Sequence, residues 1–313
     1  MTTALRVAMM GTGGVGGYFG ARLADSGHDV AFLARGRHLE AIRRDGLRVH
    51  SPLGDLSLPD PRATDDPAEV GPVDMVVVGV KLWDTEQAVS SLAPMQGDRT
   101  AVVSLQNGVM KDDVLARTVG AAHVLGGVCY IAATIAEPGV IEHSGSLQRI
   151  VIGEFDGTRS PRVEAFRAAL ADAGVDVDVA VSEQIERTTW EKFVFLVGLS
   201  GTTSLARTTI GPIRSHPRSR AFLYDVMDEV VQVARAQGVA LPADFADDRL
   251  AFVDTVPATM TSSMHRDLER GHRLEVDWLS GDVVARGARL GVSTPANRAI
   301  AEVLAVHAEG SAP

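Results

Sequence analysis

The 313-residue sequence has a single cysteine, few aromatic residues and no apolar run that approaches the length of a membrane span. Cys129 cannot form an internal disulfide, and no basic segment followed by an apolar one resembles a secretory signal. We therefore expect a cytoplasmic protein in which Cys129 is a buried thiol. Nine histidines are scattered without the spacing of metal ligands, so no metal site is expected.

Positive charge is also scarce, since 30 Lys and Arg stand against 40 Asp and Glu. A net charge of −10 disfavours nonspecific binding to nucleic acid or to an anionic membrane, and leaves local basic residues to bind an acidic ligand. The chain is longer than one core usually requires. We therefore expect a globular protein of two domains that acts on a small molecule.

The most informative motif present is Gly-x-Gly-x-x-Gly at Gly11, Gly13 and Gly16, directly after a short apolar run. In a dinucleotide-binding fold, Gly11 permits a tight turn after the strand, Gly13 lets the backbone approach a pyrophosphate, and Gly16 lets the next helix pack closely. The N–H groups at the start of that helix then face the phosphates. Glycine clusters also occur in ordinary turns, but here a helical pattern that stops at Gly27 follows.

The residues after the second predicted strand indicate which dinucleotide is bound. An acid there would accept hydrogen bonds from a ribose 2′-hydroxyl, but the sequence is Ala34-Arg35-Gly36-Arg37-His38. A guanidinium binds a phosphate through two hydrogen bonds and stacks on adenine. The alternative is a pair of solvated loop arginines. We predict NADP(H) in preference to NAD(H).

The alternation of apolar runs and helical patterns predicts an α/β fold, with an N-terminal Rossmann-type doubly wound domain followed by an all-α C-terminal domain. Strands are expected at Val30–Leu33, Met75–Val80, Ala101–Leu105 and Val124–Cys129. A peripheral hairpin is expected at Leu47–Leu58, antiparallel strands at Thr134–Glu142 and Leu147–Gly153 around Glu137-Pro138-Gly139, and a last strand near Val175–Val181. Helices of this domain are expected at Thr85–Leu92, Lys111–Thr118 and Pro161–Ala173.

Beyond Ser182 the β-signals fade, which predicts domains of residues 1–182 and 183–313 with a cofactor cleft between them. Helices are expected at Ile185–Leu199, Arg218–Gln237, Asp244–Asp254, Ala258–Arg270, Arg273–Leu290 and Pro295–Ala308, with turns at Gly211-Pro212 and Leu241-Pro242. The apolar helices make a homodimer plausible.

Lys192 stands at the head of a segment that is apolar on every helical face, which predicts a mostly buried helix. A buried amine loses hydration, its pKa falls, and it can then donate a proton near neutral pH. The alternative is a lysine that extends to the surface at the start of the helix. Glu191 cannot serve as its partner, because adjacent residues do not face each other on a helix.

Glu275 is a second charge in apolar surroundings, because apolar residues follow at its i+3, i+4 and i+8 positions. A buried carboxylate usually needs a partner, whereas the alternative is an edge residue paired with Arg270 or Arg273. Asn107-Gly108 follows a predicted strand, where an amide can contact cofactor and substrate or simply form a turn. The hydroxyls of residues 261–263 could bond their own backbone or face a ligand.

Taken together, these motifs resemble the ketopantoate reductase (2-dehydropantoate 2-reductase) family over nearly the whole chain. The matching motifs are Gly11–Gly16, Arg35, Lys81 in Val80-Lys81-Leu82-Trp83, Gln106-Asn107-Gly108, Trp190-Glu191-Lys192, Ser262–Met264 and Glu275-Val276-Asp277. The spacing in sequence between Ser263 and Glu275 is the same as in the family.

The resemblance implies hydride transfer from NADPH to a 2-keto acid while Lys192 protonates the developing alkoxide, most directly the reduction of 2-dehydropantoate to (R)-pantoate in pantothenate biosynthesis. It implies catalytic roles for Lys192 and Glu275, and substrate contacts from Asn107, Lys192, Ser200 and Ser263. The implied cofactor-binding residues are Gly11, Thr12, Gly13, Gly14, Val15, Gly16, Arg35, Lys81, Asn107, Ala132 and Glu275.

The sequence departs from the family at Leu196 and Ser200, where well-characterised members carry substrate-contacting asparagines one and two turns after the lysine. Leucine cannot hydrogen-bond a substrate hydroxyl. The chain is therefore either a divergent ketopantoate reductase or a paralogue for a more apolar 2-keto acid, such as a branched-chain or aryl one.

Two further classes of protein share part of this set of motifs. A non-catalytic NADP(H)-binding sensor would keep the glycine loop and Arg35, but has no reason to place Lys192 and Glu275 in apolar helices. A dehydrogenase of 3-hydroxy acids or sugar nucleotides shares the two-domain plan. It is disfavoured because the interval between Ser263 and Glu275 fits the ketopantoate pattern without gaps.

Overall fold

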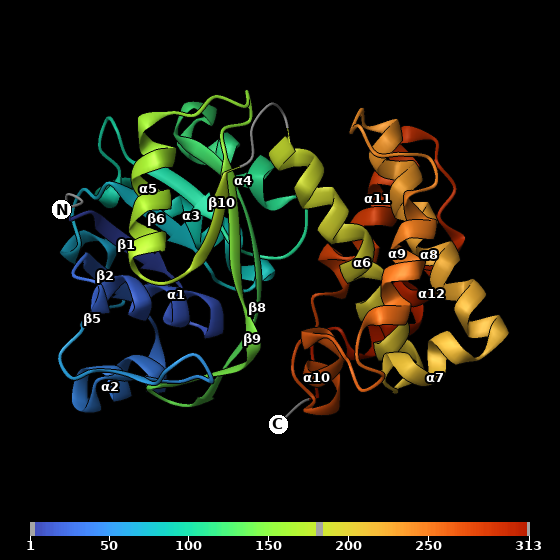
Figure 1. Ribbon diagram of the computed structural model, residues 1–313, viewed down its shortest axis with the longest axis horizontal. Coiled ribbons are helices and arrows are strands. Elements are labelled where there is room, and N and C mark those ends of the chain that lie inside the picture. Colours follow the sequence, from blue (N-terminus) through green and yellow to red (C-terminus); the bar gives the residue numbers. More distant parts are fainter. Residues whose placement is uncertain (1–3, 180–183, 312–313) are drawn as a thin grey trace. The chain divides into compact units, whose positions relative to one another are not determined.

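A computed structural model describes residues 4–179 and 184–311. Contacts within the chain divide it into two units, one of residues 1–107 and 111–186 and the other of residues 108–110 and 187–313. The boundary predicted at residue 182 falls outside the described residues. The first unit contains the sheet and the second is helical, which confirms the predicted fold class (Figure 1).

The first unit is built on one sheet with the strand order β4-β3-β9-β8-β7-β6-β1-β2-β5, and β10 pairs with β9. Strands β8, β7, β6, β1, β2 and β5 run parallel to their neighbours, whereas β9 is antiparallel to β8. The strands are β1 (Arg6–Met10), β2 (Asp29–Leu33), β3 (Leu47–His50), β4 (Leu56–Leu58), β5 (Arg62–Thr64), β6 (Met75–Val78), β7 (Ala101–Ser104), β8 (Val124–Glu137), β9 (Val140–Gly153) and β10 (Asp176–Val179).

The parallel strands are buried on both faces, and this explains their continuous apolar sequences. Successive side chains alternate between two cores: Val7 and Met9 pack on the side of α1 (Gly14–Asp25), α2 (Gly36–Asp45) and α5 (Pro161–Asp172). Ala8 and Met10 pack on the side of α3 (Thr85–Ser90) and α4 (Lys111–Val119). Both faces of the sheet are therefore covered, as a doubly wound fold requires.

Two features of this unit differ from the sequence-based expectation. β3 and β4 form the predicted antiparallel hairpin, but β5 has no predicted counterpart. The antiparallel strands predicted around Glu137-Pro138-Gly139 are confirmed, but their bounds differ, because β8 ends at Glu137 and β9 begins at Val140. Gly139, at φ +79°, makes the turn between them.

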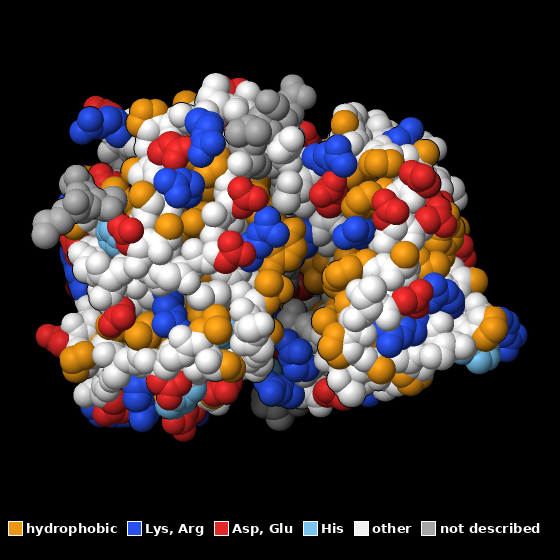
Figure 2. Space-filling model, viewed as in Figure 1, with side chains coloured by type: hydrophobic (Ala, Val, Ile, Leu, Met, Phe, Trp, Pro, Cys, Tyr) orange, Lys and Arg blue, Asp and Glu red, His pale blue; other side chains and the backbone are white. Residues whose placement is uncertain are grey.

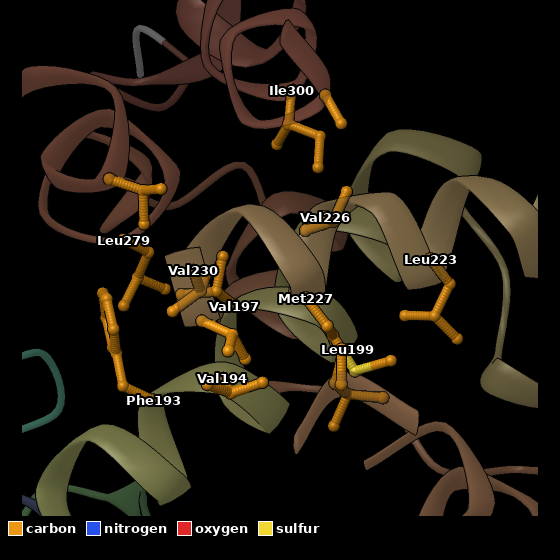
Figure 3. Close-up of a cluster of buried hydrophobic side chains, with 14 of the residues drawn as sticks. Phe193, Val194, Val197, Leu199, Leu223, Val226, Met227, Val230, Leu279 and Ile300 are labelled. Carbon is orange, nitrogen blue, oxygen red and sulfur yellow. The ribbon is translucent and has the colours of Figure 1, made fainter. Parts of the chain in front are cut away.

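In the second unit, the long helix α6 packs against α8, with Val194 and Val197 near the α8 side chains Met227 and Val230, while Phe193 lies beside Leu279 (Figure 3). The helices are α6 (Gln184–Ala206), α7 (Ile210–Ser215), α8 (Pro217–Ala236), α9 (Phe245–Thr255), α10 (Ser263–Glu269), α11 (Ser280–Leu290) and α12 (Pro295–Leu304). Among the described residues, no helix combines the length and apolar character needed to cross a membrane.

Glycines set the close packing around α6. A Cβ at Gly198 would lie 2.6 Å from Cγ of Met227, and one at Gly201 would lie 2.6 Å from Cδ1 of Ile300 on α12. Real Cβ atoms do not approach that closely, so both neighbouring helices depend on a bare backbone at these positions.

Three helix predictions are wrong in the second unit. α7 forms across the predicted Gly211-Pro212 turn, because a proline in the first helical turn gives up no intrahelical hydrogen bond. The helix expected from residue 258 begins only at Ser263, where Ser262 Oγ accepts a hydrogen bond from the backbone N–H of His265. The helix expected over residues 273–290 begins at Ser280, because Leu279 has non-helical backbone angles (φ −106°, ψ −98°).

Candidate active site

The glycine loop joins β1 to α1 at the carboxyl edge of the parallel sheet. The backbone nitrogens of Gly11 and Thr12 donate to the Leu33 carbonyl at 3.2 and 2.9 Å, and Thr12 Oγ1 donates to the same oxygen at 3.0 Å. These bonds fix the loop to the end of β2. No side chain caps the start of α1 at Gly13, so its first N–H groups remain for an anionic ligand.

Each glycine of the motif has its own steric reason. Gly11 has φ +104°, and its Cβ would lie 2.7 Å from the Val80 backbone nitrogen. A Cβ at Gly16 would lie 2.0 Å from the Gly11 carbonyl oxygen. A Cβ at Gly13 would meet nothing nearer than 3.9 Å. Packing within the protein therefore requires Gly11 and Gly16, whereas Gly13 borders open space, as the close approach of a pyrophosphate would need.

Arg35 and Arg37 follow β2 at the same edge of the sheet. Both are exposed, and within the part of the chain that the structure describes neither side chain has a hydrogen-bond partner. Arg35 is the N-cap residue of α2 with an extended backbone (φ −135°, ψ 157°). Both residues therefore follow the strand whose last residue holds the glycine loop, a position from which a guanidinium can bind a 2′-phosphate.

Lys81 and Asn107 occupy the corresponding ends of β6 and β7. Lys81 is exposed, and its Nζ lies 5.5 Å from the centroid of the Trp83 ring. Asn107 is half-buried. The parallel pairing of β1 with β6 and of β6 with β7 puts these residues at the same edge as the glycine loop.

Gln106 is a site residue to which the sequence assigned no separate role. Its Nε2 donates to the Val80 carbonyl at 2.9 Å and to Thr85 Oγ1 at 2.8 Å, while its Oε1 accepts from Ser104 Oγ at 2.9 Å. The buried amide thus holds the segment before Lys81 to the segment before Asn107. Its partner Val80 lies 26 residues away, and no local pattern reveals such a contact.

Ala132 lies at an irregularity of the β8–β9 ladder, where the pairing shifts between Ile131 and Ala133. A Cβ at Gly14 would lie 2.2 Å from the Ala133 carbonyl oxygen, so the start of α1 packs directly against this bulge. The exposed Ala132 is therefore next to a residue that contacts the glycine loop. The six predicted cofactor residues of the loop, Gly11 to Gly16, are consecutive and span the end of β1 and the start of α1.

In the second unit, Lys192, Leu196 and Ser200 lie along one line of α6 at intervals of one turn. Lys192 is half-buried, which is intermediate between the buried amine and the surface lysine that the sequence allowed. Leu196 is also half-buried and packs against the helical core. Ser200 is 1 % exposed, and its Oγ has no hydrogen-bond partner within the described residues.

Glu275 is 6 % exposed and directly precedes a short 3-10 helix, η5 (Val276–Trp278), rather than lying inside a long helix. Its backbone carbonyl accepts from the N–H groups of Trp278 and Leu279. Arg273, one suggested partner, lies 3.3 Å from Glu309 and stacks on the Trp278 ring. Glu275 is thus buried as predicted. The long helix on which its apolar i+3, i+4 and i+8 neighbours were expected to lie does not form.

Other contacts bring α10 and α11 to one stretch of α6. His265 Nδ1 lies 2.9 Å from the Thr203 carbonyl oxygen, which ties the helix that begins at Ser263 to α6. A Cβ at Gly201 would lie 3.5 Å from Ser280 Oγ at the start of α11. Ser262, rather than Ser263, caps α10, which leaves the half-buried Ser263 hydroxyl to other partners.

The first unit therefore gathers a glycine loop, free guanidinium groups, a lysine and an amide at one sheet edge. The second supplies a half-buried lysine, a buried carboxylate and hydroxyl groups. No cluster of three or more His, Cys, Asp or Glu suited to a metal occurs among the described residues. Fold and residues together define a two-domain, dinucleotide-dependent oxidoreductase.

Comparison with known proteins identifies the family. The model of the ketopantoate reductase PanE/ApbA family matches residues 7–157, and the model of its C-terminal part matches residues 184–308. The chain belongs to the ketopantoate reductase family and is an oxidoreductase that acts on CH–OH groups.

Full-length relatives agree with this assignment. The 2-dehydropantoate 2-reductase of Halobacterium salinarum is 35% identical over 301 residues, which cover 96% of this chain and 98% of the relative. The crystal structure of 2-dehydropantoate 2-reductase from Geobacter metallireducens has a TM-score of 0.88 at 35% identity, covering 96% of this chain and 99% of that one.

A more distant solved structure shares the fold alone. D-mandelate dehydrogenase, solved with NADH and anilino(oxo)acetate, has a TM-score of 0.87 at 19% identity and covers 97% of this chain and 98% of its own. The same architecture therefore accommodates NADH and an aryl ligand in that protein.

Proposed function

We propose that this protein reduces 2-dehydropantoate to (R)-pantoate with NADPH, as a cytoplasmic enzyme of pantothenate biosynthesis. The observation that carries the proposal is the joint presence of the dinucleotide-binding edge in the first unit and of Lys192 and Glu275 in the second. A protein that only binds a nucleotide needs the first set and gains nothing from the second.

The residues present fit NADP(H). The open space above Gly13 and the uncapped start of α1 suit a pyrophosphate, and Arg35 and Arg37 suit a 2′-phosphate. Lys81, Asn107 and Ala132 would contact the remainder of the cofactor, and Glu275 would contact the nicotinamide ribose. When bound, NADPH supplies the hydride that the carbonyl carbon of the substrate accepts.

The chain's own groups would carry out the rest of the reaction. Lys192 Nζ would donate a proton to the oxygen of the reduced carbonyl, and its positive charge would stabilise the negative charge that develops there. Glu275 would orient Lys192, while Asn107, Ser200 and Ser263 would hold substrate oxygens. The orphaned Ser200 hydroxyl supports its inclusion in this set.

A more apolar 2-keto acid is the second candidate substrate, and Leu196 favours it. One turn after Lys192, a half-buried leucine offers a hydrocarbon surface and no hydrogen bond. A branched-chain or aryl side chain would gain from that contact, whereas the hydroxyl of 2-dehydropantoate would lose a partner.

Oxidation of NADPH, followed at 340 nm with a panel of 2-keto acids, tests the proposal. We expect turnover with 2-dehydropantoate at a kcat/KM above that with 2-ketoisovalerate, and weaker activity with NADH. A preference for 2-ketoisovalerate or an aryl 2-keto acid would instead establish the second candidate. Tight NADPH binding without turnover on any of these acids would contradict both.

A further inference from the structure

We propose that His38 is a positioning residue for the dinucleotide, because its imidazole ties the glycine loop to α2 and to the β8–β9 hairpin. The inference rests on the proposed binding of NADP(H) at this loop. It assigns a role to a residue that contacts the protein backbone and does not take part in the reaction itself.

Both ring nitrogens of His38 have backbone partners. Nε2 lies 2.8 Å from the Thr12 carbonyl oxygen, and the Gly139 N–H donates to Nδ1 at 3.0 Å. A carbonyl only accepts and a backbone N–H only donates, so Nε2 must carry the proton and Nδ1 must not. One neutral tautomer satisfies both bonds, and the doubly protonated ring does not.

These bonds connect segments that lie far apart in the sequence. Thr12 lies between Gly11 and Gly13, and its other hydrogen bonds run to Leu33. Gly139 forms the hairpin turn, and a Cβ there would lie 3.3 Å from Cβ of Ala41 on α2. His38 therefore holds the Thr12 carbonyl, while Leu33 holds the Thr12 N–H and hydroxyl, and His38 does so from the helix whose N-cap residue is Arg35.

The surroundings of His38 keep the ring neutral. Burial lowers the pKa of the imidazole below the ordinary value of 6.5, and the hydrogen bond to Thr12 has a smaller effect in the opposite direction. The charged residues of α2 are Arg37, Glu40, Arg43, Arg44 and Asp45, and Arg35 is its N-cap residue. Arg48 and Glu137, on either side of the hairpin turn, pair at 3.8 Å, and residues 10–16 of the loop carry no charge. The form that makes both hydrogen bonds is therefore present at neutral pH, and in acid the protonated ring keeps only the bond from Nε2 to Thr12.

Three substitutions separate the two hydrogen bonds. In His38→Gln, the amide N–H can reach the position of Nε2 and keep the bond to Thr12. In His38→Asn, the shorter side chain can place its oxygen near Nδ1 and keep only the bond to Gly139. His38→Ala removes both. Because the Thr12 bond is the one that holds the loop, His38→Gln is the conservative variant.

Affinity for NADP⁺, measured by calorimetry without substrate, provides the test. We expect the dissociation constant to rise about three- to ten-fold in His38→Asn and His38→Ala, as the loss of one hydrogen bond predicts, and less than two-fold in His38→Gln. With saturating NADPH and substrate, kcat should stay within about two-fold in all three, because the bond acts on binding.

The pH dependence separates the two hydrogen bonds. In acid the protonated ring loses the bond from Gly139 and keeps the bond from Nε2 to Thr12, so NADP⁺ affinity in the wild type should follow that in His38→Gln as the pH falls, and a steeper fall in the wild type would show that the Gly139 bond holds the loop. His123→Gln is the matched control, because His123 Nδ1 makes a similar 2.8 Å contact with the Thr100 carbonyl away from the loop. It should leave the affinity and its pH profile unchanged.

Equal affinities for the wild type and His38→Asn, or equal losses in His38→Gln and His38→Ala, would overturn the inference while leaving the proposed function intact. A loss of affinity in His123→Gln as large as in His38→Asn would also overturn it. If the wild-type protein bound neither NADP⁺ nor NADPH, the proposed function would fail first and this inference with it.

Discussion

Two neighbouring glycines should respond in opposite ways to the same added methyl group. In Gly16→Ala the new Cβ would lie 2.0 Å from the Gly11 carbonyl oxygen, whereas in Gly13→Ala it would lie no closer than 3.9 Å to any atom. Neither residue has a positive φ, so alanine is compatible with both backbone conformations. The two variants therefore differ in contacts and not in backbone strain.

For Gly16→Ala, relief of the overlap requires the loop and α1 to separate by roughly 1.5 Å, the difference between this distance and an ordinary contact of about 3.5 Å. Overpacking of this kind costs about 1–3 kcal/mol. In a unit of this size, that corresponds to a decrease in Tm of about 2–12 °C. The displaced loop should also bind NADPH more weakly, since small misplacements of a binding group have large effects.

For Gly13→Ala, the Tm should be unchanged or slightly raised, because alanine restricts the unfolded chain more than glycine does. Affinity for NADPH should fall at least ten-fold, because the methyl group would occupy the space reserved for the pyrophosphate. Differential scanning calorimetry and NADPH titration measure the two quantities on the same samples. Normal NADPH affinity in Gly13→Ala, or a normal Tm in Gly16→Ala, would refute this account of the loop.

The remaining predictions concern the chemistry and the two specificities. Lys192→Ala should lower kcat by about 10²–10⁴-fold with NADPH affinity little changed, because it removes the proton donor; turnover close to normal would exclude that role. Arg35→Ala should reduce the preference for NADPH over NADH by about ten- to a hundred-fold, as the loss of a charge-assisted phosphate contact predicts, and a preference that survives unchanged would show that Arg35 lies away from the 2′-phosphate. Leu196→Asn should raise kcat/KM for 2-dehydropantoate relative to 2-ketoisovalerate, and an unaltered ratio would place Leu196 outside the substrate pocket.

The parallel sheet was predictable because burial on both faces leaves a strong trace in the sequence. Met75–Val78 and Ala101–Ser104 are uninterrupted short runs between polar segments, and both are strands of the sheet. β5 gave no such signal, because Arg62–Thr64 is three residues long and only partly buried. Its place in the sheet depends on pairing with β2, which no local pattern records.

In the helical unit, prediction from the sequence is limited in a different way. The apolar character of α6 predicted its burial. The non-helical backbone of Leu279, which separates η5 from α11, follows from packing and leaves no pattern in the sequence. The local motifs identified Arg35, Lys81 and Asn107 at the strand ends. They could not identify His38 or Gln106 as supports of the loops, because the partners Gly139 and Val80 lie 101 and 26 residues away.

On the face shown in Figure 2, acidic and basic side chains are interspersed over both units. The net charge of −10 is therefore not concentrated into a single acidic region on this side. Binding of an anionic cofactor and a 2-keto acid then depends on a few placed cations and N–H groups rather than on the overall field of the protein.

The glycines of α6 limit how this enzyme can diversify. A methyl group at Gly198 or Gly201 would have to displace the Met227 side chain of α8 or the Ile300 side chain of α12, and Leu199 between them belongs to the same hydrophobic core. Mutations at these positions are selected against because they destabilise the fold, whatever their effect on catalysis. New substrate ranges in this scaffold should therefore arise through half-buried positions such as Leu196, where a side chain can change while the helices keep their spacing.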